Sequence, residues 1–454
     1  MAESQNEVAV LELGGDHDAS LEAARTLSGG GAPAAQAIED AWPTLSPLAR
    51  RRALGVLAVL AEEHDAAVDA LVAVARSEDE ALTRDALEIL AESGRRGHRG
   101  LETLAFDLAQ GDAAALTLAR SDPARALPVL VRALEARGPE AGAELRQAFA
   151  TAVRRLGDGA ETLLLDWVGT EPSPAALANA ALALAPLDEQ RGTQTAMVEA
   201  AVGRPSDFAT EWRLAVAAST SGPSAAVDAW LVAQSRQPET WMLRAAAVDA
   251  LAARDRAQLP EQALEDTYPR VRASAAAAFA GDSSTMTTRA TMARRDTWPL
   301  VRAAAVTSLQ GETQALPVVV AAVDDPMSQV RAAAIAVLVD ASEPSGWNRV
   351  HARLRRQDEW PEVVEGAIAY VVAHCRRDAV EGLYFVIKRA ASPSALTDDV
   401  QNAARAVETL RVLGTPEGSA ILAQLEASEG VPEPLQMALK RPVSEASRCA
   451  ERSP

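Results

Sequence analysis

A unit of close to 30 residues recurs along the second half of the chain, and this recurrence constrains the fold more than any other feature. In each copy an Asp stands six positions before an Arg, a Val precedes the Arg, and small residues follow it. The three clearest copies contain Asp266/Arg272, Asp296/Arg302 and Asp325/Arg331. Tandem units of this length are typical of solenoids, in which each helix pair packs mainly on its neighbours.

The step from an apolar residue to Arg extends the pattern toward the N-terminus. It falls at Arg213, Arg244, Arg272, Arg302 and Arg331, at intervals of 31, 28, 30 and 29 residues. Beyond Arg331 the step is degenerate, because Glu365 follows Val364 where the pattern would place an Arg.

Composition favours helices. Aromatic residues make up only 4% of the chain, and alanine dominates its apolar content. Alanine has the highest helix propensity, whereas a sheet would favour Val, Ile, Tyr and Thr. A chain of 454 residues also exceeds what one globular core usually supports. We therefore predict an all-α superhelix, a solenoid of about a dozen helix pairs.

The helical segments are joined by short links that contain Gly, Pro, Asp or Ser, as helix–helix connections usually do. No linker is long enough to divide the chain into independent domains. We expect a flexible lead-in over residues 1–15, the solenoid over 16–440 with its clearest repeats over 205–340, and a disordered polar tail over 441–454.

The segment from Ala315 to Leu338 resembles the HEAT repeat, in particular the short bacterial type grouped with phycobilisome-lyase-like repeats. The resemblance implies that first helices line the convex side of the solenoid and second helices the concave side. It also implies that the Asp and Arg residues form a ladder within and between adjacent repeats. By resemblance this role falls to Asp266, Arg272, Asp296, Arg302, Asp325 and Arg331.

Asp207/Arg213 and Glu78/Arg84 have the same spacing, and we expect the same role for them. The Arg244 unit departs from the pattern, because Pro238 stands where the Asp should be. Physical chemistry supports the ladder independently, since an Arg beside an apolar stripe needs carboxylate and carbonyl acceptors for its fixed set of donors. The alternative for these arginines is an anion-binding site.

Aromatic residues recur at the start of first helices, at Trp241, Tyr268, Trp298 and Trp360. Three of them precede a Pro in the same local frame. Stacked repeats would bring the rings into a stripe along one edge. Each ring would then cover its neighbour's turn and hold adjacent repeats together, or the stripe would anchor a peptide partner.

A second candidate for partner binding is a set of arginines on second helices, at Arg289, Arg295, Arg349, Arg353 and Arg356. If second helices face the concavity, these side chains would form a basic spot suited to an acidic peptide or a phosphate. The alternative is ordinary solvated charge.

The sequence contains no pattern that predicts catalysis, a metal site or a cofactor. The five histidines are not paired at helical spacing, and nucleotide-binding and nucleophile motifs are absent. Asp16-His17-Asp18 could chelate a metal, but a solvated acidic loop is the better explanation. Cys375 and Cys449 are far apart in sequence, so we expect neither a disulfide framework nor a cysteine zinc site.

The formal net charge of −19 opposes both a broad nucleic-acid-binding role and docking on an anionic membrane. The N-terminal residues lack the pattern of a signal peptide, and no long uncharged apolar stretch occurs. We therefore expect a cytoplasmic protein, a monomer, that works as a non-catalytic scaffold or adaptor for protein partners. Two rivals remain: a bilin-lyase-like or other HEAT-fold enzyme or chaperone that acts on a protein, and a nucleic-acid-directed role.

Overall fold

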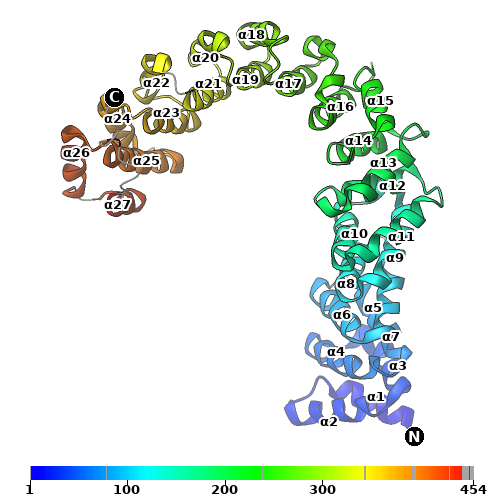
Figure 1. Cartoon of the computed structure of the whole chain (residues 1–454). Coiled ribbons are helices and arrows are strands. Elements are labelled where there is room, and N and C mark those ends of the chain that lie inside the picture. The colour runs from blue at the N-terminus through cyan, green and yellow to red at the C-terminus, as the bar shows by residue number, and fades with distance from the viewer. Residues whose placement is uncertain are drawn as a thin grey trace. The chain divides into compact units, whose positions relative to one another are not determined.

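The computed structural model describes residues 2–77, 79–107, 109–237, 239–341, 344–390, 395–428, 430–441 and Cys449. Every regular element in these residues is a helix (Figure 1). The chain forms two compact units that divide between Trp230 and Leu231, inside helix α15 (Ala225–Gln234). The sequence indicated a single array over 16–440. We call residues up to Trp230 unit 1 and residues from Leu231 unit 2.

Unit 1 consists of two rows of helices. One row packs in the order α2 (His17–Ser28), α4 (Pro47–Ala61), α6 (Glu80–Glu92), α8 (Gly111–Ser121), α10 (Ala143–Leu156), α12 (Pro174–Leu184) and α14 (Phe208–Ala218). The helices between them are α1 (Ala2–Glu12), α3 (Gly31–Ala41), α5 (Asp65–Ala75), α7 (Gly94–Leu104), α9 (Pro123–Arg137), α11 (Asp158–Val168) and α13 (Arg191–Ala201). Residues 2–12, expected in a flexible lead-in, form α1, and Val10 and Leu13 are fully buried against the next helices.

Unit 2 repeats this organisation. Its inner row consists of α16 (Trp241–Arg254), α17 (Pro269–Ala278), α19 (Pro299–Ser308), α21 (Ser328–Asp340), α23 (Pro361–Ala373) and α25 (Thr397–Leu413), each packed on the next. Its outer row consists of α18 (Met286–Arg295), α20 (Leu316–Ala322), α22 (Trp347–Leu354) and α24 (Val380–Ala390). The helices α26 (Pro416–Glu426) and α27 (Glu433–Lys440) pack on α25.

Short 3-10 helices occupy several connections: η1 (Trp42–Thr44), η2 (Gly138–Glu140), η3 (Asp188–Gln190), η4 (Arg256–Gln258), η5 (Glu261–Glu265), η6 (Thr313–Ala315), η7 (Pro344–Gly346) and η8 (Arg377–Ala379).

The sequence determines where the inner helices begin and end. Pro269, Pro299 and Pro361 occupy the first helical turn, where the missing N–H costs nothing and φ is already helical. Each Pro also keeps the preceding residue extended. After α17 and α19 the chain turns at Gly281 and Gly311, whose φ values of 81° and 80° favour glycine.

The arginines of the repeat lie on the inner row, which follows the inner side of the bend from α17 to α24 within unit 2 (Figure 1). The resemblance implied the opposite order, with first helices on the convex side and second helices facing the concavity. The reason is packing: buried alanines such as Ala275, Ala305, Ala334 and Ala367 let the inner helices approach closely. The more closely packed row of a curved array lies on its inner side.

Candidate functional site

Ion pairs join successive inner helices of unit 2. Arg272 donates Nε and Nη2 to the carboxylate of Asp296, at 2.8 and 2.9 Å. Its Nη1 donates to the backbone oxygen of Asp266, at 2.8 Å. Arg302 repeats the arrangement, with both bonds to the Asp325 carboxylate at 2.8 Å and one to the Asp296 backbone oxygen at 2.9 Å. Each Arg therefore binds the backbone of its own turn and the carboxylate of the next.

Similar contacts occur in the repeat before Arg272 and in the repeat after Arg302. Arg244 donates two hydrogen bonds to the Asp266 carboxylate, at 2.7 and 2.9 Å, although the sequence placed this unit outside the pattern because of Pro238. Pro238 itself lies outside the described residues. At the other end Arg331 binds the backbone oxygen of Asp325 at 2.8 Å, and its Nη2 pairs with Glu359. Glu359 therefore takes the place of an Asp.

Burial and hydrogen bonding compete at these carboxylates. Burial alone would raise the pKa of Asp266. The hydrogen bonds from Arg244 and from the Tyr268 N–H, together with the charges of Arg244 and Arg272, hold that pKa below its usual value. For Arg302 the hydrogen bond from its guanidinium to Asp325 raises the pKa. Both shifts favour the charged forms.

Asp207 and Arg213, in unit 1, are arranged differently. Asp207 caps α14 by accepting the Thr210 N–H at 2.8 Å, and the hydrogen bonds from Thr210 lower its pKa. Among the described residues no hydrogen bond joins Asp207 to Arg213, whose buried Nη1 has no partner. Glu78, expected to pair with Arg84, lies outside the described residues.

An inter-repeat contact with a neutral amide in place of the carboxylate exists in unit 1, and the sequence analysis did not predict it. Arg146 on α10 donates to the Ala141 oxygen at 2.8 Å and to Asn179 Oδ1 at 3.0 Å. Asn179, fully buried on α12, donates to the backbone oxygens of Gly138 and Ala175 at 3.0 and 2.9 Å. An Asn within the apolar run of α12 was the available signal, because a buried amide needs hydrogen-bond partners.

Four large side chains occupy the N-cap position of four successive inner helices: Tyr268, Trp298, Met327 and Trp360. We call these four residues the anchor row. Their side chains are exposed, with relative accessibilities of 47%, 54%, 45% and 59%. The sequence identified the three aromatic members and missed Met327, because Pro326 precedes it and no Pro follows.

The backbone that carries the anchor row is fixed. All four residues have extended φ and ψ angles, and each N–H donates to the ladder carboxylate just before it, at 2.8–3.0 Å. The ladder and the row are therefore parts of one structure, since the carboxylates that pair with arginines also position the anchors.

Trp241 differs from the other aromatic candidates. It is half-buried and stacks on Tyr268, with ring centroids 5.6 Å apart and planes 14° apart. The Arg244 guanidinium lies 5.8 Å from the centre of the Tyr268 ring. This end of the row thus joins adjacent repeats, as one interpretation of the stripe required, while Trp298 and Trp360 extend into solvent.

The arginines predicted to form a basic spot do not gather at one accessible place. Arg289 is fully buried, so it cannot belong to a partner-binding surface. Its guanidinium binds the backbone oxygens of Asp282 and Ser308 and lies 3.5 Å from Glu312. The prediction assumed that second helices present these arginines to the concavity, whereas Arg289 lies inside the packing of the repeats.

Most of the other predicted arginines are neutralised by carboxylates. Arg349 and Arg353 both pair with Asp324, and Arg353 also approaches Glu359. Arg356 pairs with Asp358 at 2.8 Å on the surface. Arg295 is exposed at the end of α18, next to the equally exposed Arg294, and no ion pair within the described residues involves either. Of the five predicted arginines, only Arg295 therefore has no ion pair among the described residues.

A stack of rings lies inside the packing of α22 against α23. Trp347 stacks on His351 at 4.8 Å and on Tyr370 at 6.1 Å, and its Nε1 donates to Asp378 at 2.7 Å. Trp347 and Tyr370 are 6% and 0% exposed. Burial lowers the pKa of His351, assisted by the charge of Arg355. Trp347 and Tyr370 are therefore part of the core, whereas Asp378 at the edge of the stack is exposed.

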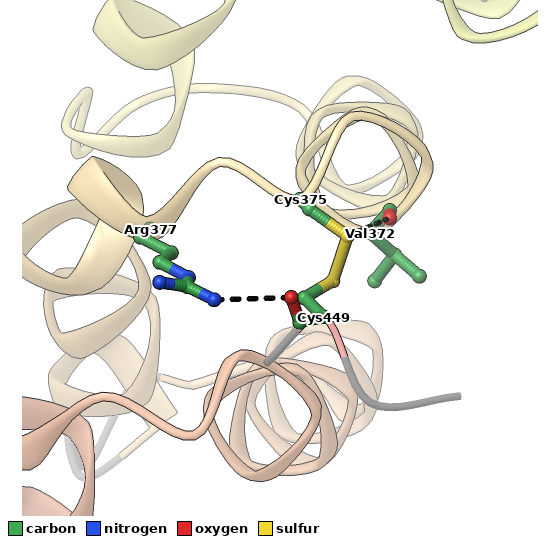
Figure 2. Close-up of a disulfide and its surroundings, with 4 residues drawn as sticks. All are labelled: Val372, Cys375, Arg377 and Cys449. Atoms are coloured by element: carbon green, nitrogen blue, oxygen red, sulfur yellow. Dashed lines mark hydrogen bonds between the residues drawn. A yellow bond between two sulfur atoms is a disulfide. The ribbon is translucent and has the colours of Figure 1, made fainter. Parts of the chain in front are cut away.

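Cys375 and Cys449 form a disulfide, with Cα atoms 5.5 Å apart (Figure 2). The sequence-based expectation of no disulfide was wrong, because a separation of 74 residues says nothing about distance in a folded chain. The Arg377 side chain also donates to the Cys449 backbone oxygen at 3.1 Å. Most of the expected disordered tail, residues 442–448 and 450–454, lies outside the described residues.

Within the described residues no helix is long and apolar enough to cross a bilayer. No group of three or more His, Cys, Asp or Glu side chains there is arranged to hold a metal ion.

No family model matches the sequence, and no curated protein matches it. Solved structures with a similar path include the karyopherin Kap121p bound to Ste12p (TM-score 0.49, 11% identity, 96% of this chain and 55% of that one). The structure of Kap121p bound to Nup53p has a TM-score of 0.48 and 11% sequence identity, with the same shares of both chains covered. The structure of Kap121p alone has a TM-score of 0.45 and 13% sequence identity. The chain spans about half the length of these proteins.

These TM-scores are too low to carry an argument. The protein's own contacts define its class: helices in two packed rows, with arginine–carboxylate contacts between successive turns in unit 2. It is an all-α solenoid of HEAT-like repeats.

Proposed function

We propose that the protein is a non-catalytic scaffold that binds protein partners through the anchor row of unit 2. One observation carries this proposal: Tyr268, Trp298, Met327 and Trp360 are all exposed at equivalent positions of consecutive repeats. Exposed large apolar side chains in a regular arrangement are unusual on a surface that contacts only water. Aromatic residues also dominate the binding energy of protein interfaces.

The bilin-lyase-like alternative, with its bacterial repeat type, has less support. A deep apolar groove lined by Tyr, Trp and Asp would favour it. Trp347, Tyr370 and Asp378 do lie together, but Trp347 and Tyr370 are buried in the core. A nucleic-acid-directed role would need a continuous basic groove, whereas the arginines of the predicted basic spot are mostly paired with carboxylates.

The scaffold proposal predicts that partner capture depends on the anchor row. Immobilised full-length chain would retain a set of proteins from a host lysate, and the double variant Trp298→Ala/Trp360→Ala would lose that set, because two of the four anchors are gone. Trp212→Ala is the matched control, since Trp212 is 41% exposed on α14 of unit 1. Quantitative mass spectrometry measures the retained set. Retention by the double variant at the wild-type level would refute the proposal.

A further inference from the structure

The anchor row has a spacing that selects one backbone conformation in a partner. Its four residues cap α17, α19, α21 and α23, and each of these helices packs directly on the next. Packed helices lie about 8–10 Å apart, so successive anchors are separated by about that distance along the row. A linear partner must therefore present one apolar side chain at the same interval.

An extended strand fits this interval poorly. Three strand residues span about 10 Å, but strand side chains alternate between faces, so every third residue points the wrong way. A polyproline II helix has three residues per turn and rises about 3.1 Å per residue, so every third residue returns to the same face after about 9.3 Å. Aromatic rows also bind proline-rich segments well, because such segments are already ordered before binding.

Charge identifies a further feature of the partner. Arg294 and Arg295 end α18 immediately before the turn that carries Trp298, and both are exposed without an ion pair in the described residues. The nearby carboxylates Asp296 and Asp325 are already bound to ladder arginines. Two exposed arginines without an ion pair in the described residues therefore precede Trp298 by four and three positions, and a partner carboxylate complements their charge.

We infer that the anchor row binds a proline-rich segment in the polyproline II conformation, with every third residue on an anchor and an acidic residue beside the one seated on Trp298. This inference rests on the proposed scaffold function and names the chemistry of the partner. Arg294 and Arg295 pair with the acidic residue and determine the position of the segment along the row.

The probe is a fluorescein-labelled peptide of about 12 residues with proline at every third position and one central glutamate. Fluorescence anisotropy with the full-length protein measures its affinity. We expect saturable binding, and a weakening of at least about tenfold for Trp298→Ala, as is typical for an interface anchor. Trp212→Ala should bind as the wild type does. Circular dichroism of each variant checks that the fold is intact.

Two further comparisons test the register and the charge. A peptide of the same composition with irregularly placed prolines should bind at least about tenfold more weakly, because only one or two residues can meet anchors. Arg294→Glu/Arg295→Glu should weaken binding of the glutamate peptide and strengthen binding of its lysine counterpart. Equal binding of regular and irregular peptides would overturn the inference.

Lack of saturable peptide binding up to about 1 mM, the weak limit of specific recognition, would also overturn the polyproline inference.

The scaffold proposal and the polyproline inference can fail separately. If no proline-rich peptide binds but lysate capture still depends on Trp298 and Trp360, the polyproline inference is wrong and the scaffold proposal stands. If capture is also independent of the anchors, both are wrong.

Discussion

At the scale of single residues, the ladder arginines of unit 2 are difficult to replace. Arg302 has 11% of its side chain exposed, and so has its partner Asp325. An Arg in this position satisfies three acceptors in two turns with one rigid guanidinium. Lysine would supply a point charge and could not make the same paired contacts.

We expect Arg302→Ala to destabilise unit 2 by about 3 kcal/mol, because removing one partner leaves the Asp325 carboxylate partly buried without its cation. The melting temperature should fall by roughly 6–12 °C for a unit of this size. The control Arg356→Ala breaks an exposed surface pair with Asp358 and should leave the melting temperature nearly unchanged. Thermal unfolding followed by circular dichroism decides, and equal melting temperatures for both variants would exclude a structural role for Arg302.

Sequence patterns found the ladder residues, and the resemblance implied contacts within and between repeats, but neither identified the oxygen that each guanidinium binds. A spacing of six residues places Asp266 and Arg272 in one turn, where the contact is to the backbone oxygen. The carboxylate contact runs to Asp296, 24 residues later, and depends on how the repeats stack. For the same reason the sequence could not show that Arg289 is buried, since its burial comes from the neighbouring repeat.

At the scale of elements, helices with strong start signals were predictable and covalent tethers were not. The Trp-Pro steps named from the sequence mark the starts of α19 and α23. The disulfide between Cys375 and Cys449 left no local signal. It encloses α24, α25, α26 and α27 in one covalent loop.

Reduction of this disulfide should loosen the last four helices. A loop of about 75 residues contributes roughly 4 kcal/mol in the chain-entropy account, by restricting the unfolded state. We expect hydrogen exchange in α25 and α27 to accelerate after reduction, or in the variant Cys375→Ser/Cys449→Ser, while α17 and α19 keep their protection. Mass spectrometry of the full chain measures both regions together.

Exchange in α25 and α27 that does not respond to reduction would show that packing alone holds these helices.

The oxidation state of the two cysteines in cells also bears on the location of the protein. Disulfides persist in oxidising compartments and are rare in the cytoplasm, so thiol labelling of the native protein tests the cytoplasmic location proposed from the sequence.

At the scale of the whole molecule, the net charge is distributed unequally between the units. Unit 1 contains 35 acidic and 19 basic residues, a net charge of −16, while unit 2 contains 28 and 25, a net charge of −3. Many carboxylates of unit 2 pair with arginines in the ladder and on the outer row. The net negative charge of the chain therefore lies mainly in unit 1 and not in unit 2, which carries the anchor row.

We expect salt to stabilise unit 1 more than unit 2. Like charges in unit 1 repel one another in the folded state, and raising the salt from about 0.01 M to about 0.1 M shortens the screening length from about 30 Å to about 10 Å. The same change weakens the exposed ion pairs of unit 2, so its response should be small or opposite. Hydrogen exchange of the full chain at the two salt concentrations measures each unit. A neutral osmolyte, which acts on both units alike, is the control. An equal gain of protection in the two units on adding salt would show that charge repulsion in unit 1 is negligible.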